Sequence, residues 1–289
     1  MQIGSVTLAN PVMTASGTAG YGTELASYLD LASLGAVVVK SLAAFEWAGN
    51  PAPRLHPTPR GMLNAVGLQG PGLPYWLEHV LPDLLHAGAT VVASIWGRTV
   101  EEFGRAAELV AAAPPEVIAV EVNLSCPNLH GGQAVFAHDP ERSAVVIEAA
   151  RACGRPLWAK LSPNTDRVVE VAAAVSAAGA EAVTCINTLR GLAYDPATGR
   201  PALGAGGGGL SGPAIHPVAV RIVHDVHVAL PDVPIVGVGG VASGWDAMEL
   251  LLAGATAVQV GTASFADPRA PAKVLAALRR LVARPDPVR

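Results

Sequence analysis

The segment Asn123–Gln133, with the sequence NLSCPNLHGGQ, places a cysteine between a serine and a proline directly after an apolar run. Pro127 lacks a backbone N–H and holds a turn, so the thiol of Cys126 is predicted to be accessible. A thiol whose pKa is brought toward neutrality can act as a nucleophile or a general base. Cys126 is therefore the candidate catalytic residue, whereas Cys153 and Cys185 lie in helix-like and strand-like sequence and are expected to pack in the core.

Lysine is rare in this chain, with three lysines against 16 arginines. Lys40 and Lys160 each end an apolar, strand-like run, which would place an ammonium group at the end of a buried strand. Such a group suits a ligand anion or, if its pKa is lowered, Schiff-base chemistry with a carbonyl substrate. The structural alternative is an ion pair with a carboxylate of the same core, such as Glu121. The sequence leaves both interpretations open.

Asparagine and glycine form two further groups of candidates. Side-chain amides carry donors and an acceptor, so several converging asparagines suit a flat heterocycle with alternating N–H and C=O groups. The candidates are Asn64, Asn123, Asn128 and Asn187. Glycines after strands let backbone N–H groups close on an anion, which indicates a phosphate-bearing ligand near LSGPA (210–214), GVGG (237–240) and VGT (260–262). Taken singly, each asparagine also fits a turn or cap, and each glycine fits a tight turn.

The elements that must position these residues follow a repeated pattern of an Ala-rich helical segment, then Gly-Ala, then a β-branched run. Glycine suits the left-handed position just past a helix, and the run after it is typical of a strand buried on both faces. The pattern occurs at 33–41, 86–95, 177–187 and 252–262, and further apolar runs fit strands at 11–16, 117–125, 156–162 and 233–240. These alternating units predict an α/β fold, a closed (β/α)8 TIM barrel, ahead of an open doubly wound sheet.

The predicted barrel is a single domain over residues 1–289, with a short N-terminal strand segment and inserted active-site loops. The glycine-rich segments 61–72 and 198–214 are expected to be those loops, and the second is expected to cover the substrate, with a disordered surface insertion as the alternative. Catalytic groups of such barrels lie at the C-terminal ends of the strands. Besides the residues above, those ends supply Ser16, Gly17, Ser41, Ser94, Thr188, Gly239, Gly240, Gly261 and Thr262.

Composition narrows the class of ligand. The net charge is −4 and the basic residues are scattered, which argues against nucleic acid or an anionic membrane as a partner. No basic N-terminal region precedes an apolar run, and no uncharged apolar stretch reaches the roughly 18 residues of a membrane helix, so a cytoplasmic protein is expected. The cysteines form no C-x-x-C pair, which gives no support to a metal or iron–sulfur site on this chain.

Several motifs resemble class 1 dihydroorotate dehydrogenases, in order from the first predicted strand to beyond residue 265. They are NPVMTASGTAGYG (10–22), VVVKS (37–41), NPAPR (50–54), GMLNAVGLQGPG (61–72), NLSCPNLHGGQ (123–133), AKLSPN (159–164), INT (186–188), GGLSGPAIHPVA (208–219), PIVGVGGV (234–241) and AVQVGTASFADP (257–268). The cysteine segment is the most specific of them. Within the class, HGGQ after the cysteine and the GLQ loop resemble the 1B type.

The resemblance implies a barrel with one FMN per chain that oxidises (S)-dihydroorotate to orotate in pyrimidine biosynthesis. Cys126 would be the general base that removes the C5 proton while the C6 hydride passes to the flavin. Substrate-binding residues would be Lys40, Asn64, Val66, Gly67, Leu68, Asn123, Asn128, Asn187 and Thr188. FMN-binding residues would be Ala15, Ser16, Gly17, Lys40, Ser41, Ser94, Asn123, Lys160, Ile186, Gly212, Gly239, Gly240, Gly261 and Thr262.

The 1B resemblance also implies a partner. Electrons would leave through a subunit that carries FAD and a [2Fe–2S] cluster and pass to NAD+, in a heterotetramer built on a homodimer of this chain. Two residues depart from the family pattern, because Ser94 and Gly70 stand where asparagine is usual, and Trp96 beside Ser94 is also unusual. A serine at 94 is shorter, so a direct flavin contact there could become water-mediated.

Three other functions compete with this one. An FMN-dependent dihydropyrimidine dehydrogenase shares the cysteine motif, although Lys40 favours a substrate with a carboxylate. A Schiff-base aldolase barrel would use Lys160 as its nucleophile. A barrel that only binds a phosphate ligand would not need Cys126.

Overall fold

Eight parallel strands form a barrel in the computed structural model, which describes residues 1–124 and 136–283. The strands, in their order around the sheet, are β3 (Val12–Thr14), β14 (Ala257–Val260), β13 (Ile235–Val238), β10 (Ala182–Cys185), β9 (Leu157–Lys160), β8 (Val117–Asn123), β7 (Val91–Ile95) and β4 (Val37–Val38). A parallel bridge between Met13 and Ala36, with Gly35 N donating to Val12 O at 2.8 Å, joins β4 back to β3. The predicted TIM barrel is confirmed.

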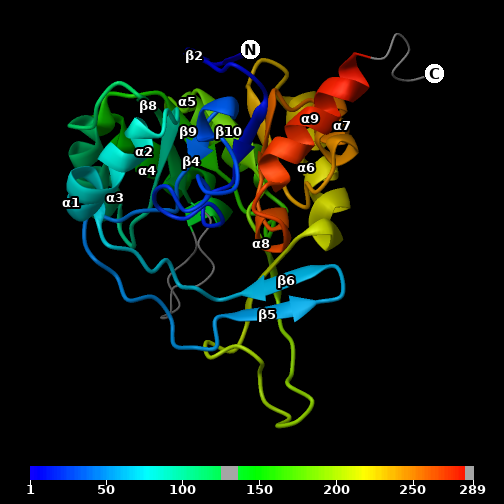
Figure 1. Cartoon of the computed structure of the whole chain (residues 1–289). Coiled ribbons are helices and arrows are strands. Elements are labelled where there is room, and N and C mark those ends of the chain that lie inside the picture. Colours follow the sequence, from blue (N-terminus) through cyan, green and yellow to red (C-terminus); the bar gives the residue numbers. More distant parts are fainter. Residues whose placement is uncertain (125–135, 284–289) are drawn as a thin grey trace.

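Helices cover the outside of the barrel (Figure 1). They are α2 (Leu81–His86), α3 (Val100–Ala111), α4 (Pro140–Ala150), α5 (Val168–Ala177), α6 (His216–Ala229), α7 (Gly244–Leu252) and α9 (Ala270–Val282), with the short α1 (Leu73–Tyr75) and α8 (Ala263–Ala266). Local sequence sets their ends: Ser243 and Asp246 form a capping box at the start of α7, and Gly254 takes a φ of +113° just after its end.

The first repeat differs from the predicted pattern. A 3₁₀ turn, η1 (Leu31–Ser33), stands between β3 and β4 where the pattern predicted a helix. Residues 23–29 before it form turns and bends, and the Asp30 side chain caps the 3₁₀ turn by accepting a hydrogen bond from Ala32 N at 3.0 Å.

The short N-terminal strand segment is also confirmed. Strands β1 (Gln2–Ile3) and β2 (Val6–Thr7) pair antiparallel, and the N-terminus lies at the end of the barrel opposite β5 and β6 (Figure 1). Ile3 and Leu8 are buried in one apolar cluster with Trp158 and Val38 from the barrel strands. The hairpin therefore closes the amino-terminal end of the barrel, which leaves the carboxyl-terminal end for a ligand.

A second sheet extends from that carboxyl-terminal end. It is antiparallel, and its strands in order are β11 (Leu189–Gly191), β12 (Gly208–Ser211), β6 (Gly61–Asn64) and β5 (Leu55–Thr58). The segments 61–72 and 198–214, predicted as loops, thus contribute paired strands, and the second is not a disordered insertion. The glycines are needed for close packing, because a Cβ at Gly209 would overlap the Thr188 side chain. We call these four strands the roof sheet.

No helix within the two described ranges is both long and apolar enough to span a bilayer.

Candidate active site at the barrel mouth

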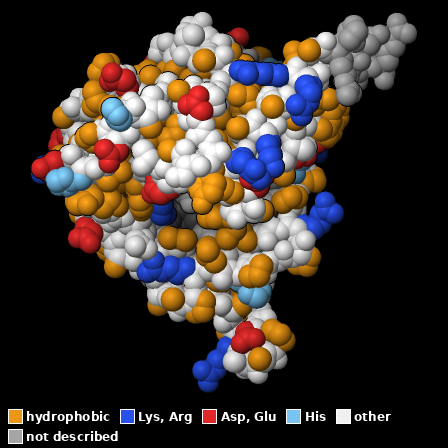
Figure 2. Space-filling model, viewed as in Figure 1, with side chains coloured by type: hydrophobic (Ala, Val, Ile, Leu, Met, Phe, Trp, Pro, Cys, Tyr) orange, Lys and Arg blue, Asp and Glu red, His pale blue; other side chains and the backbone are white. Residues whose placement is uncertain are grey.

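A cavity of about 160 Å³, open to solvent, lies between the carboxyl ends of the barrel strands and the roof sheet. Figure 2 shows the surface hollowed between the barrel and the β5–β6 strands. The predicted residues that line it are Ala15, Ser16, Gly17, Lys40, Ser41, Asn64, Val66, Gly67, Leu68, Asn123, Lys160, Ile186, Asn187, Thr188, Gly212, Gly239, Gly240, Gly261 and Thr262. Apolar side chains and a few polar groups line it together, which is the composition typical of a ligand site.

Lys160 lies at the floor of the cavity and contacts a buried carboxylate. Its Nζ is 3.5 Å from Glu121 Oε1 and 3.4 Å from Ser16 Oγ, and the Glu121 side chain is 0% exposed. Gln259 Nε2 donates to Glu121 Oε2 at 2.7 Å. The structural alternative is therefore confirmed, because Lys160 forms an ion pair with Glu121, and Lys160 also lines the cavity.

A chain of hydroxyl and amide groups crosses one wall of the cavity. Asn123 Nδ2 donates to Ser41 Oγ at 3.1 Å, and Asn187 Nδ2 lies 3.4 Å from Asn123 Oδ1. The Asn187 side chain also accepts from Thr188 N at 2.8 Å. These contacts fix which way the two amides face, so their remaining donors and acceptors are oriented before a ligand binds.

Ser94 is the one predicted residue of the described chain that does not line the cavity. It is fully buried, and its Oγ lies 2.9 Å from Ser41 Oγ. Because Ser41 itself lines the cavity, Ser94 reaches the site through the Ser41 hydroxyl.

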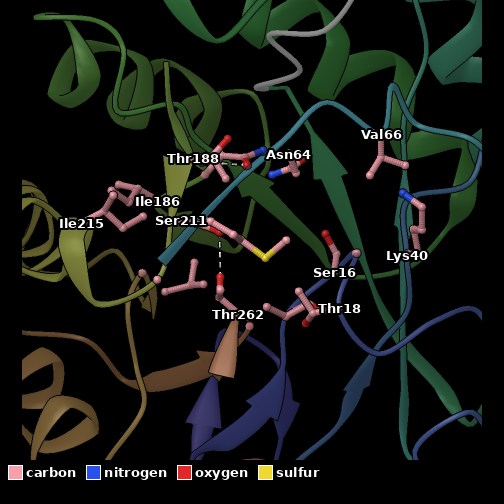
Figure 3. A pocket seen from close by; sticks show the side chains of 18 of the residues that line it. Ser16, Thr18, Lys40, Asn64, Val66, Ile186, Thr188, Ser211, Ile215 and Thr262 are labelled. Carbon is pink, nitrogen blue, oxygen red and sulfur yellow. Dashed lines mark hydrogen bonds between the residues drawn. The ribbon is translucent and has the colours of Figure 1, made fainter. Parts of the chain in front are cut away.

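Glycines form one end of the cavity. Gly212 and Gly240 have φ values of +95° and +69°, in the left-handed region that favours glycine. A Cβ at Gly240 would lie 2.7 Å from His216 Cβ and 2.8 Å from Gly212 O, so no side chain fits there. Nearby, Thr262 Oγ1 donates to Ser211 Oγ at 2.8 Å (Figure 3). Bare backbone and two hydroxyl groups beside the start of α6 have the chemistry of an anion cradle.

The opposite side of the cavity carries Lys40 and the segment 66–68. Figure 3 shows Lys40 and Val66 across the cavity from Ile215, which follows the Gly212 turn. Leu68 has a φ of +59° and is the non-glycine residue with positive φ in the described chain. Such a conformation costs about 1 kcal/mol or more and is concentrated at functional sites.

Sequence reasoning missed seven residues that line the cavity, namely Thr18, Leu55, Met62, Ser211, Ile215, Val238 and Phe265. Met62 could have been found, because it lies two residues before Asn64 and shares its face once 61–64 is recognised as a strand. Leu55 and Phe265 are half exposed at the rim, which only the tertiary structure reveals.

The cysteines divide as follows. Cys126 and Asn128 lie outside the described residues. Cys153 and Cys185 are buried and do not line the cavity, as predicted. Burial raises the pKa of the Cys185 thiol to about 12, and burial also raises the pKa of Cys153. These two thiols are therefore packing groups.

The fold and the cavity define an enzyme-type α/β barrel, with polar groups gathered at the carboxyl ends of its strands and glycines lining the cavity after the last two. A family model described as dihydroorotate dehydrogenase matches residues 1–282. The chain belongs to the dihydroorotate dehydrogenase family.

Individual relatives agree with this assignment. The chain is 48% identical over 285 residues to the catalytic subunit of dihydroorotate dehydrogenase B (NAD(+)) of Geotalea daltonii. The match covers 98% of this chain and 93% of the relative. It is 49% identical over 271 residues to the protein of the same name from Geotalea uraniireducens, covering 93% and 88%. It is 47% identical over 279 residues to the protein of the same name from Desulforudis audaxviator, and the match covers 96% of this chain and 90% of the relative.

Proposed function

We propose that this chain oxidises (S)-dihydroorotate to orotate in pyrimidine biosynthesis, with FMN bound in the barrel mouth. The observation that carries the proposal is that the predicted FMN and substrate residues of the described chain, except Ser94, line one cavity. Family membership gives the reaction, and the cavity supplies groups of the matching chemistry.

The residues present fit FMN. Gly212, Gly239, Gly240, Gly261 and Thr262 would hold the phosphate, in the cradle that side chains would fill if the glycines were substituted. Ala15, Ser16, Gly17, Ser41, Asn123 and Ile186 would line the flavin ring system, with Ser94 behind Ser41. Lys160 would contribute its cation at the floor. When bound, FMN supplies the acceptor for the hydride that leaves C6 of the substrate.

The substrate would lie between the amides and the segment 66–68. Asn64, Asn123, Asn187 and Thr188 offer donors and acceptors for the pyrimidine ring, and Asn64 is oriented by its bond to Gly209 O at 3.2 Å. Lys40 would attract the substrate carboxylate. The backbone N–H groups of Gly67 and Leu68 have no partner among the described residues, so they are available to the same carboxylate.

Cys126 is proposed as the general base that takes the C5 proton, and Asn128 as a further ring contact. Both follow from the family motif, in which the thiol precedes a proline directly after β8. A positioned base typically accelerates a proton abstraction by about 10²–10⁴-fold.

A partner subunit is part of the proposal. The relatives are named as catalytic subunits of an NAD(+) enzyme, and the described residues contain no group of three His, Cys, Asp or Glu side chains that could hold a metal. We infer that FAD and a [2Fe–2S] cluster on a second subunit carry electrons to NAD+, in a cytoplasmic heterotetramer built on a homodimer of this chain.

The Schiff-base alternative receives less support from the site. The Lys160 nitrogen that would have to attack a carbonyl is instead paired with the buried Glu121 carboxylate, at 3.5 Å. The dihydropyrimidine alternative would leave Lys40 facing an uncharged ring edge.

The direct test is to purify the protein, record its visible spectrum and add dihydroorotate without oxygen. We expect a bound yellow flavin that dihydroorotate bleaches, while dihydrouracil does not. A protein without flavin, or a flavin that dihydroorotate leaves oxidised, would refute the proposal. Bleaching by dihydrouracil alone would favour a dihydropyrimidine dehydrogenase. Borohydride trapping of a carbonyl compound on Lys160 would favour a Schiff-base aldolase.

A further inference from the structure

The substrate-side segment Ala65–Gly70 is held from behind by the loop 45–50. Trp47 Nε1 donates to Gly67 O at 3.0 Å, and the backbones of Trp47 and Gly70 exchange two hydrogen bonds of 2.9 Å. Asn50 N donates to Val66 O at 3.1 Å, and Asn50 Nδ2 donates to Ala65 O at 3.2 Å. Three successive carbonyl groups are thus bound on one side of the segment.

This arrangement determines what the segment offers to the cavity. Val66, Gly67 and Leu68 line the cavity, whereas Trp47 does not. Gly67 and Leu68 have φ values of +71° and +59°. Glycine adopts a positive φ readily, whereas for leucine this conformation costs about 1 kcal/mol or more. The bonds to the carbonyls compensate for that cost and leave the Gly67 and Leu68 N–H groups without a partner among the described residues.

Trp47 is itself fixed by an aromatic cluster of Phe45, Trp47 and Trp96. The ring centroids lie 5.9–6.2 Å apart, and all three pairs have edge-to-face geometry. The Arg98 guanidinium lies 5.0 Å from the centroids of Phe45 and Trp47. Its Nε and Nη2 donate to Glu102 Oε1 at 3.0 Å and 2.5 Å, and Nε also donates to Oε2 at 3.2 Å. Trp96 is buried directly after β7, so the cluster connects the barrel wall to the loop 45–50.

We propose that Trp47 is a positioning residue for the substrate carboxylate. It acts through the Gly67 carbonyl, which it binds on the side away from the cavity, and so holds the N–H groups of Gly67 and Leu68 in place. The inference rests on the proposed function, because it assigns the segment 66–68 to the carboxylate of dihydroorotate. It extends that function to a residue that contacts neither substrate nor FMN.

The test replaces Trp47 by Phe in the FMN-loaded protein, which keeps an aromatic ring in the cluster and removes the N–H donor. We expect orotate, measured by its perturbation of the flavin spectrum, to bind about 3- to 10-fold more weakly, as the loss of one hydrogen bond implies. The KM for dihydroorotate should rise by the same factor, while kcat and the Kd for FMN change less than twofold. Amide hydrogen exchange over residues 66–69 should be faster in the variant.

Trp96→Phe is the matched control, since it makes the same change in the same cluster without a bond to the segment, and its phenyl ring keeps an aromatic contact with Trp47. We expect its orotate affinity to stay within twofold of the wild type. Unchanged orotate affinity and unchanged exchange in Trp47→Phe would overturn the inference, as would equal weakening in Trp96→Phe. If Trp47→Phe does not fold, Asn50→Ser removes the donor to Ala65 O and tests the same support, with the same expected direction.

Failure of the proposed function gives a different result. The wild-type protein would then bind no FMN, or bind FMN without responding to orotate. A wild type that responds to orotate, with a Trp47→Phe variant indistinguishable from it, rejects the positioning role alone.

Discussion

Glu121 Oε1 and Lys160 Nζ lie 3.5 Å apart in the barrel interior, beneath the cavity. The strand register explains the contact: Asn123 of β8 is opposite Lys160 of β9, and Glu121 shares the Asn123 face two residues earlier. The carboxylate is completed by Gln259 from β14, on the far side of the barrel. Three strands thus converge on one buried ion pair.

Breaking that pair should destabilise the protein. Glu121→Gln leaves a buried ammonium without its counter-charge, and we expect the free energy of unfolding of the apoprotein to fall by about 3–5 kcal/mol, measured by denaturant titration. The double variant Glu121→Gln, Lys160→Met removes both charges and should recover part of the loss. A single variant within about 1 kcal/mol of the wild type would contradict the importance of the pair.

The proposed role of Cys126 as general base can be tested by substitution. Cys126→Ala should retain bound FMN and slow the bleaching by dihydroorotate about 10²–10⁴-fold, since it removes the proposed base and none of the residues that line the cavity. Cys126→Ser should lie between, because a hydroxyl is a poorer base at neutral pH. Anaerobic stopped-flow absorbance measures both rates, and wild-type kinetics in the Ala variant would refute the role as base.

The glycine cradle predicts a difference between two glycines of similar conformation. Gly240 and Gly199 have φ values of +69° and +65°, but a Cβ meets crowded atoms at Gly240 and nothing within 4 Å at Gly199. Ala at either position costs about 1–2 kcal/mol from its backbone conformation. Only Gly240→Ala should also weaken FMN binding, by about 10-fold or more, in a flavin-fluorescence titration of the apoprotein. Equal FMN affinities in the two variants would exclude Gly240 from the cradle.

Thiol reactivity tests the burial of Cys185. With a pKa of about 12, its thiolate fraction at pH 8 is about one in ten thousand, so alkylation of the native protein should leave it unmodified. Because burial raises the pKa of Cys185, its thiol stays neutral until the pH approaches 12. Peptide mass spectrometry after iodoacetamide treatment measures this, with a denatured sample as the reference. Rapid native alkylation of Cys185 would show that the strand opens.

The sequence was informative where barrel geometry leaves little choice. Parallel strands bring their carboxyl ends to one edge, so Lys40, Asn123, Lys160 and Gly240 could be placed together from strand order alone. The sequence could not decide whether Lys160 pairs with Glu121 or faces a ligand. That choice depends on the β8–β9 register, which a single sequence does not specify.

The roof sheet was the largest omission. Gly208 and Gly209 have low strand propensity, and the partner of Gly209 is Asn64, 145 residues earlier in the chain. The contact of Ser94 also could not be predicted from the sequence. Its position near the end of β7 was evident, but whether its side chain reached the cavity or stopped at Ser41 depended on packing.

The roof sheet also bears on how a ligand leaves. Its central pair, β6 and β12, comes from two different crossovers of the barrel and is joined by backbone hydrogen bonds across the cavity. A single hinged loop can swing aside on its own, but this cover moves only if both crossovers move together or the ladder between them parts. The rate at which a bound ligand dissociates should then depend on how often the roof sheet opens. Cutting the chain in either crossover should therefore shorten the residence time of that ligand.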